Sequence, residues 1–325
     1  MVQSLGGFKD ARDYQRETLS ARSYGKALLA AARADERIVC LGADLTQPTE
    51  TYLIRDQIPE RFVMLGIQEA NMIGVAGGMA RSGDIPFAHS FCVFVTRRVY
   101  DQIAMQVAYP NLPVKIVGFI PGLNTALGVS HQAIDDLALM RALPNMTVLE
   151  PCGPEQIGAA VRTAVACDGP VYLRMSIPTA VSDEAVPLLP LDRGKALMMA
   201  EGSDVAIIAV GTMVSEALGA RQLLEQKGIS ASVANFASLK PFGNDLVEEL
   251  AQRHAAIVTA ENHSVIGGLG SATAEALALA GISTRFGMVG VRDVFAEGGT
   301  TRYLMERYGL TAAHIAAKAC ALLDV

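Results

Sequence analysis

The chain has 325 residues, which is enough for about two domains with ordinary hydrophobic cores and excludes a single small binding module. Hydrophobic residues make up 51% and charged residues 18% of the chain, a balance that indicates a folded globular protein and excludes a disordered one. The 33 Asp and Glu residues outnumber the 27 Lys and Arg residues, and the formal net charge of −6 argues against nucleic-acid binding.

The sequence also argues against export and membrane insertion. Its first 20 residues lack the basic end and apolar core of a signal peptide, and no segment contains about 18 consecutive apolar residues. The five cysteines are scattered without a CxxC spacing, which is typical of buried thiols in a reducing compartment. We therefore expect a cytoplasmic protein with no membrane contact and no metal site of its own.

Short apolar segments rich in β-branched residues alternate with amphipathic segments through the first half of the chain. The apolar segments end at Asp44, Ile67, Ile120, Pro151 and Ser176, and such near-continuous apolar runs are typical of buried parallel strands. Between them, SYGKALLAAARAD, VYDQIAMQVAYP and EQIGAAVRTAVACD have the periodicity of helices with one apolar face. The alternation predicts an α/β domain in which helices cover both faces of a mainly parallel sheet.

A change in composition divides the chain into two such domains. Residues 180–202 are rich in proline and charge, which is typical of a linker. After them, DVAIIAVG, ISASVANF and AAIVTAEN predict strands, and helices are predicted over 212–227, in LVEELAQRH and in SATAEALALAG. We expect an N-terminal extension over 1–18, a first domain over 19–183, a linker over 184–202 and a second doubly wound α/β domain over 203–325.

Glu69 is the first candidate functional residue, because the sequence contains no general motif for nucleotide, zinc-protease or serine-hydrolase chemistry. The segment GIQEANMIGVAGGMA places Glu69 where a strand passes into a helix, with Arg81 as the next charged residue. Burying a carboxylate costs free energy unless a specific partner holds it, so Glu69 is a candidate for handling a proton. Capping of the helix is the alternative interpretation. Gly74, Gly77 and Gly78 let another segment approach this helix closely.

Two phenylalanines and two arginines follow the next strand. Phe91 and Phe94 bracket the strand end, where they can stack on a flat heterocycle; core packing is the alternative. Arg97 and Arg98 open the following helix, and either can bind an anionic group or form a surface ion pair.

His131 is the best histidine candidate for acid–base chemistry. It opens a helix beyond the carboxyl end of the strand that ends at Ile120, and ligands of open parallel sheets bind at this edge. A structural role at the helix start is the alternative. Asp135 and Asp136 occupy the first turn of the same helix, where they favour its dipole.

Five segments together resemble the C-terminal half of the transketolase family in their order and spacing, from about Leu19 to the end of the chain. They are GADL from Gly42, GIQEANM from Gly66, the pair Phe91 and Phe94, SHQAIDDLALMRALPNMTVLEP from Ser130, and AENHSVIGGLGS from Ala260. The resemblance implies a thiamine-diphosphate pyrimidine-binding domain followed by a transketolase C-terminal domain. It also implies transfer of a two-carbon ketol unit from a ketose to an aldehyde.

The resemblance further implies roles for individual residues at the cofactor. Glu69 matches the glutamate that hydrogen-bonds the aminopyrimidine ring, and Phe91 and Phe94 match the aromatic pocket that stacks on it. Arg97 stands where the family often has a third aromatic ring, and Asp44 matches an aspartate near the cofactor and the substrate channel.

Substrate-binding roles follow from the same resemblance. His131 matches a histidine that contacts substrate hydroxyl groups, and Arg22 and Arg174 match arginines that bind a sugar phosphate. Leu127 replaces an aspartate that reads a sugar hydroxyl, and Phe119 replaces a phosphate-binding histidine. These two departures predict a ketose-like or 2-oxo donor other than the usual pentose phosphates.

The family's N-terminal half has no counterpart in this sequence. The GDG motif, followed by an asparagine, that holds magnesium and the diphosphate is absent. The resemblance therefore implies a split transketolase in which a separate subunit binds the diphosphate and Mg²⁺, in an α2β2 heterotetramer. Three alternatives stay open: the β chain of a 2-oxoacid dehydrogenase, an enzyme like deoxyxylulose-phosphate synthase, and a degenerate subunit that only regulates a partner.

Overall fold

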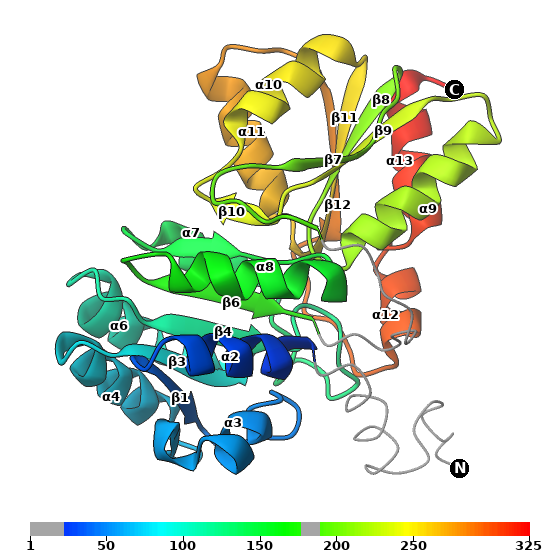
Figure 1. Ribbon diagram of the computed structural model, residues 1–325. Coiled ribbons are helices and arrows are strands. Elements are labelled where there is room, and N and C mark those ends of the chain that lie inside the picture. Colours follow the sequence, from blue (N-terminus) through cyan, green and yellow to red (C-terminus); the bar gives the residue numbers. More distant parts are fainter. Residues whose placement is uncertain (1–22, 177–188) are drawn as a thin grey trace, which may run out of the picture.

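The computed structural model describes residues 23–176 and 189–325, which form two α/β domains, one above the other in Figure 1. No helix in these two ranges is both long and apolar enough to cross a bilayer. Arg22, a predicted substrate ligand, lies outside the described residues, as do the predicted N-terminal extension over 1–18 and residues 184–188 of the predicted linker.

The first domain is built on a seven-stranded sheet that is parallel except at one edge. Burial of nearly every residue in its central strands agrees with the apolar runs that predicted them. The strand order across the sheet is β10 (Ser238–Lys240), β5 (Thr147–Leu149), β6 (Val171–Met175), β4 (Lys115–Phe119), β3 (Ile85–Phe91), β1 (Ile38–Gly42) and β2 (Phe62–Met64).

Helices flank this sheet, and α2 lies beside α8 on the face seen in Figure 1. On α2, Tyr24, Leu28 and Ala32 recur four residues apart and are buried, which is why this segment forms an amphipathic helix. The helical segments are α2 (Ser23–Ala34), α3 (Tyr52–Gln57), η1 (Pro59–Arg61), α4 (Glu69–Arg81), α5 (Cys92–Val95), η2 (Arg97–Val99), α6 (Tyr100–Ile103), η3 (Ala104–Ala108), α7 (Asp136–Ala142) and α8 (Pro154–Val165).

The predicted close approach to α4 is made by η3. A Cβ atom on Gly77 would lie 2.8 Å from the backbone oxygen of Gln106, and one on Gly74 would lie 2.9 Å from the Gln106 side chain. Gly78 faces open space. Two of the three glycines therefore let η3 pack against α4.

The second domain has a five-stranded sheet with helices on both faces, which confirms the predicted doubly wound α/β class. Helices α9 and α13 pack together on one face, and α10 and α11 pack together on the other (Figure 1). The strand order is β12 (Arg285–Val291), β11 (Ala256–Ser264), β8 (Val205–Ala209), β9 (Ala231–Asn235) and β7 (Leu197–Ala200). The helices are α9 (Met213–Glu225), α10 (Asn244–Arg253), α11 (Leu269–Leu279), α12 (Thr301–Arg307) and α13 (Ala312–Leu323).

Two strands correct the predicted division of the chain. Strand β7 lies inside the expected linker over 184–202 but pairs antiparallel with β9, so the linker ends before Leu197. Strand β10 belongs to the C-terminal part of the sequence but pairs antiparallel with β5 of the first sheet. Both strands are three or four residues long and lie at sheet edges, so a short backbone pairing places them without a long apolar run.

A buried ion-pair cluster joins the two domains. The side chain of Arg174 is 0% exposed, and its Nε donates a hydrogen bond to Asp136 at 2.7 Å. Its Nη1 donates to Glu150 at 3.0 Å, and its Nη2 donates to the backbone oxygens of Ala133 and of Asn262 on β11, each at 3.0 Å. The prediction that Arg174 binds a substrate phosphate is therefore wrong, because its donors are engaged and no solvent reaches it.

Candidate functional site

Four neighbouring strands of the first sheet deliver the candidate residues to one edge. The strands lie in the order β4, β3, β1 and β2, and all four are parallel, so their carboxyl ends meet there. Asp44 follows β1, Glu69 follows β2, Phe94 follows β3 and His131 lies in the loop after β4. Ligands of open α/β sheets bind at this edge.

Glu69 is the first residue of α4 and is 2% exposed. Ser90 Oγ, on the buried strand β3, donates a hydrogen bond to Glu69 Oε1 at 3.3 Å. Arg98 Nη1 donates to Glu69 Oε2 at 3.1 Å in an ion pair whose arginine side chain is 49% exposed. The positive end of the α4 dipole adds to the field that holds this buried carboxylate.

An aromatic wall stands beside Glu69. The ring centroids of Phe91 and Phe94 are 6.0 Å apart, and the imidazole of His131 lies 5.2 Å from Phe94 and 6.2 Å from Phe91. The guanidinium carbon of Arg98 lies 4.1 Å above the Phe94 ring, in a cation–π contact. Phe94 is only half-buried, so part of this wall reaches the surface of the sheet edge.

Burial and the neighbouring charges shift the pKa values of two candidate groups at this edge. Desolvation, and after it the negative charge of Glu69, raise the pKa of Asp44. Burial, and after it the positive charge of Arg98, lower the pKa of His131. The imidazole is therefore held neutral near pH 7, when it can accept a proton. Ser130 Oγ lies 2.9 Å from His131 Nδ1 and fixes the ring.

Other predicted site residues lie apart from this cluster. Phe119 is 2% exposed and packs edge-on against Tyr24 at 5.3 Å, so it belongs to the core and does not line a pocket. Leu127 is 63% exposed in the loop that carries His131. Arg97 faces Asp135, with 3.7 Å between Nη1 and Oδ2, so its ion pair is with Asp135 and not with Glu69.

Two further details correct the sequence interpretation. The helix after β4 begins at Asp136, so His131 lies in the preceding loop and not in the first helical turn. Asp136 is fully buried and accepts hydrogen bonds from Arg174 and from Tyr172 Oη at 2.6 Å, so it holds the domain junction and does more than favour a helix dipole.

Ser90 and Arg98 are the residues that sequence reasoning did not choose. The residues alone gave no preference between Arg97 and Arg98, and the family resemblance favoured Arg97. The irregular winding of α5 and η2 hides from the sequence that Arg98 is the arginine that turns toward Glu69. Ser90 is buried on β3 between His89 and Phe91, and its polarity inside an apolar strand was the available signal.

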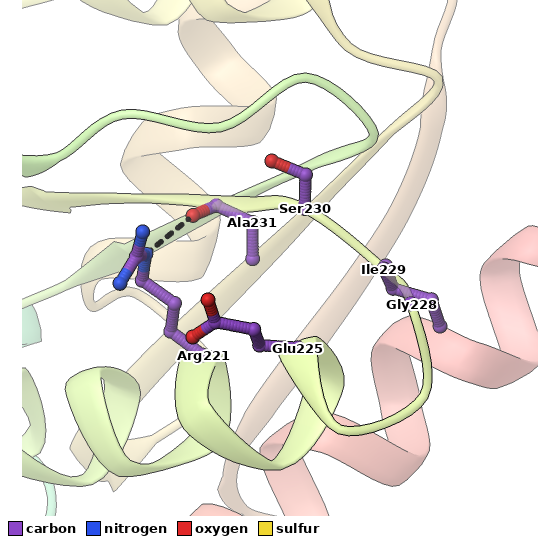
Figure 2. A pocket seen from close by; sticks show the side chains of 6 residues that line it. All are labelled: Arg221, Glu225, Gly228, Ile229, Ser230 and Ala231. Atoms are coloured by element: carbon purple, nitrogen blue, oxygen red, sulfur yellow. Dashed lines mark hydrogen bonds between the residues drawn. The ribbon is translucent and has the colours of Figure 1, made fainter.

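The second domain carries a hollow away from the candidate site. A shallow hollow of about 230 Å³ lies on the second domain, lined by Arg221, Glu225, Gly228, Ile229, Ser230 and Ala231. Figure 2 shows the Arg221 guanidinium turned back to the protein, where Nε donates to the backbone oxygen of Ala231 at 3.2 Å. Within residues 23–176 and 189–325, His, Cys, Asp and Glu side chains form no group of three that could hold a metal ion.

Comparison with known proteins identifies both domains. Residues 19–179 match the family description "Transketolase, pyrimidine binding domain", and residues 194–315 match "Transketolase, C-terminal domain". The chain belongs to the transketolase family. It carries that family's pyrimidine-binding and C-terminal domains in the order that the sequence resemblance predicted.

Relatives in the transketolase family include separate subunits of this length. The 6-deoxy-6-sulfo-D-fructose transketolase subunit of Clostridium sp. (strain MSTE9) is 46% identical over 299 residues, which cover 90% of this chain and 91% of the relative. A solved structure described as "Split gene transketolase, inactive beta4 tetramer" has a TM-score of 0.86 and 43% identity, covering 95% of this chain and 98% of that one. The 1-deoxy-D-xylulose-5-phosphate synthase of Symbiobacterium thermophilum is 35% identical over 303 residues, which are 92% of this chain and 46% of the synthase.

Proposed function

We propose that this chain is the pyrimidine-binding subunit of a thiamine-diphosphate-dependent transketolase that works with a separate diphosphate-binding subunit. The observation that carries the proposal is the buried carboxylate of Glu69 in a cluster with the half-buried Phe94 ring, both contacted by Arg98. An aminopyrimidine is flat and carries hydrogen-bond donors and acceptors on its rim. A carboxyl group can form hydrogen bonds with its rim, and a phenyl face can stack on its plane.

Residues at the edge of the first sheet have separate proposed roles in binding the cofactor and in holding a proton. Glu69 holds a proton shared with a ring nitrogen of the cofactor, and Phe91 and Phe94 bind the ring by stacking. Asp44 lies close enough to Glu69 to feel its charge, and we assign it a place beside the cofactor and the substrate. When bound, thiamine diphosphate supplies the nucleophilic carbon that cleaves a carbon–carbon bond next to a carbonyl group.

His131 is the proposed proton carrier for the substrate. Its pKa is lowered by burial and by Arg98, so the neutral imidazole can take a proton from a substrate hydroxyl group near pH 7. Leu127 lies four residues before His131 and is exposed, so its apolar side chain can contact the substrate or the partner subunit. The family resemblance leads us to expect an aspartate that binds a sugar hydroxyl group at this position.

The partner subunit is proposed from two features. The sequence lacks the family's magnesium and diphosphate motif, so Mg²⁺ and the diphosphate fall to the partner. Apolar side chains are also exposed around the candidate site: Met64 is 46%, Ile67 is 70% and Val129 is 46% exposed. Apolar groups gathered at one edge favour burial in an interface. We propose an α2β2 assembly in which the partner covers this edge.

The proposed donor is a ketose that ends in an anionic group. One relative is named for 6-deoxy-6-sulfo-D-fructose, which ends in a sulfonate, and Arg22 stays a predicted ligand for such a group. The relation to 1-deoxy-D-xylulose-5-phosphate synthase favours pyruvate as the second candidate donor.

The test is a donor screen on the chain co-purified with its diphosphate-binding partner, with thiamine diphosphate, Mg²⁺ and glyceraldehyde 3-phosphate as acceptor. The donors are 6-deoxy-6-sulfofructose, fructose 6-phosphate, xylulose 5-phosphate and pyruvate. Ketol transfer from a ketose supports the proposal. Carbon dioxide release from pyruvate supports the second candidate, and branched 2-oxoacids with a lipoyl acceptor test a dehydrogenase. Cofactor binding with no turnover for any donor would favour a regulatory subunit.

A further inference from the structure

Arg98 makes two contacts that a bound aminopyrimidine would need for itself. Its Nη1 donates to Glu69 Oε2 at 3.1 Å, and its guanidinium carbon lies 4.1 Å from the centroid of the Phe94 ring. A guanidinium is flat, delocalised and rich in N–H donors, as the amino-substituted edge of the pyrimidine is. The Arg98 side chain thus contacts the Glu69 carboxylate and the face of the Phe94 ring at the same time.

We propose that Arg98 is a placeholder: its guanidinium holds the place of the aminopyrimidine at Glu69 and Phe94, and cofactor binding displaces it. The inference rests on the proposed function, because it takes Glu69 and Phe94 as the cofactor's ligands. Arg98 is then a positioning residue that acts through Glu69 and does not touch the reacting atoms.

Burial explains why the two partners need each other before the cofactor arrives. Glu69 is 2% exposed, so without Arg98 its carboxylate would keep the hydrogen bond from Ser90 at 3.3 Å but lose its cation. A buried carboxylate without a counter-charge costs free energy. The ion pair with Arg98 lowers this cost for as long as no cofactor contacts Glu69.

Burial also decides which partner moves. The Arg98 side chain is 49% exposed, so its guanidinium can turn into water and regain hydration there. It extends from η2, a turn of three residues between the short helices α5 and α6, so its departure leaves the sheet unchanged. Glu69 is fixed at the start of α4 and stays.

Displacement reduces the apparent affinity for the cofactor, because binding must first break the ion pair and the cation–π contact. Contacts of these kinds at half-exposed sites correspond to about a three- to tenfold change in a dissociation constant. Removing Arg98 is therefore expected to tighten cofactor binding. Removing a residue that binds the cofactor or supports the fold would instead weaken cofactor binding.

The test is calorimetric titration of thiamine diphosphate with Mg²⁺ into the complex with the diphosphate-binding subunit. Arg98→Ala is expected to bind about three- to tenfold more tightly than the wild type, and Arg98→Lys should lie between them, because lysine keeps the charge but loses the flat face. Arg81→Ala removes an exposed arginine from the far end of α4 and is expected to match the wild type. Unchanged or weaker binding by Arg98→Ala would overturn the placeholder, whereas a wild-type complex that binds no cofactor would overturn the proposed function itself.

A second readout needs no partner and no cofactor. Burial lowers the pKa of His131, and the charge of Arg98 lowers it further. The pKa of His131, followed by NMR of the imidazole Cε1 proton in the full chain, should therefore rise in Arg98→Ala and stay low in Arg98→Lys. An unchanged pKa of His131 in Arg98→Ala would show that the guanidinium does not rest over this edge in solution, and would overturn the placeholder even if Arg98→Ala bound the cofactor more tightly.

Discussion

Replacing Arg174 with methionine removes the cation that joins the two domains. Arg174 and Asp136 are both 0% exposed, and Glu150 is 1% exposed, so the substitution leaves two buried carboxyl groups without their counter-charge. Removing one partner of a buried ion pair costs about 3–5 kcal/mol, a large part of the roughly 5–15 kcal/mol that stabilises a typical domain. Methionine keeps most of the side-chain volume, so the loss reports charge more than packing.

Urea unfolding of the purified chain measures this loss. Arg253→Met is the matched control, because Arg253 pairs with Glu201 and Glu249 on the surface and should show no measurable change. A free energy of unfolding that falls no more in Arg174→Met than in the control would refute the assignment. An increased KM for a phosphorylated donor at unchanged stability would show instead that Arg174 binds the substrate.

Three further outcomes are expected. Glu69→Ala should reduce turnover of the complex at least about a hundredfold and leave its native mass unchanged. Near-normal turnover would show that Glu69 does not hold the proton shared with the cofactor. Burial raises the pKa of Glu150 to about 7 from 4.5, so the folded chain binds its proton more strongly than the unfolded chain, and the contribution of Glu150 to stability should fall as pH rises from about 4.5 to 7. Unfolding free energies of wild type and Glu150→Gln across this range should show that falling difference, and a difference that rises or stays flat would contradict it. Gly77→Ala should destabilise the chain by about 1–3 kcal/mol in urea unfolding, because its Cβ would meet the Gln106 backbone at 2.8 Å, whereas Gly78→Ala in open space should not; equal effects would contradict this packing.

Strong local patterns were sufficient to predict the parallel core. The runs that became β1, β4 and β6 are apolar throughout because helices cover both faces of the sheet, so the sequence alone marks them as buried strands. Strands β7 and β10 carry no such pattern, since they lie at sheet edges and depend on pairing with distant partners.

The candidate site was predictable in part for a similar reason. Glu69, Phe94 and His131 follow the carboxyl ends of adjacent strands, and sheet topology brings such residues together. The destination of Arg174 was not predictable, because its partners Asp136 and Asn262 lie 38 and 88 residues away and one of them belongs to the other domain. A charged residue in an apolar strand signals an important partner but does not say whether that partner is substrate or protein.

The most direct measurement of the central claim is an experimental structure of this chain in complex with its diphosphate-binding partner, thiamine diphosphate and Mg²⁺. We predict that the Glu69 carboxylate lies within hydrogen-bond distance of the aminopyrimidine, that Phe94 stacks on the ring and that the Arg98 guanidinium has left Glu69. A cofactor held away from Glu69, with the Arg98 ion pair intact, would contradict it.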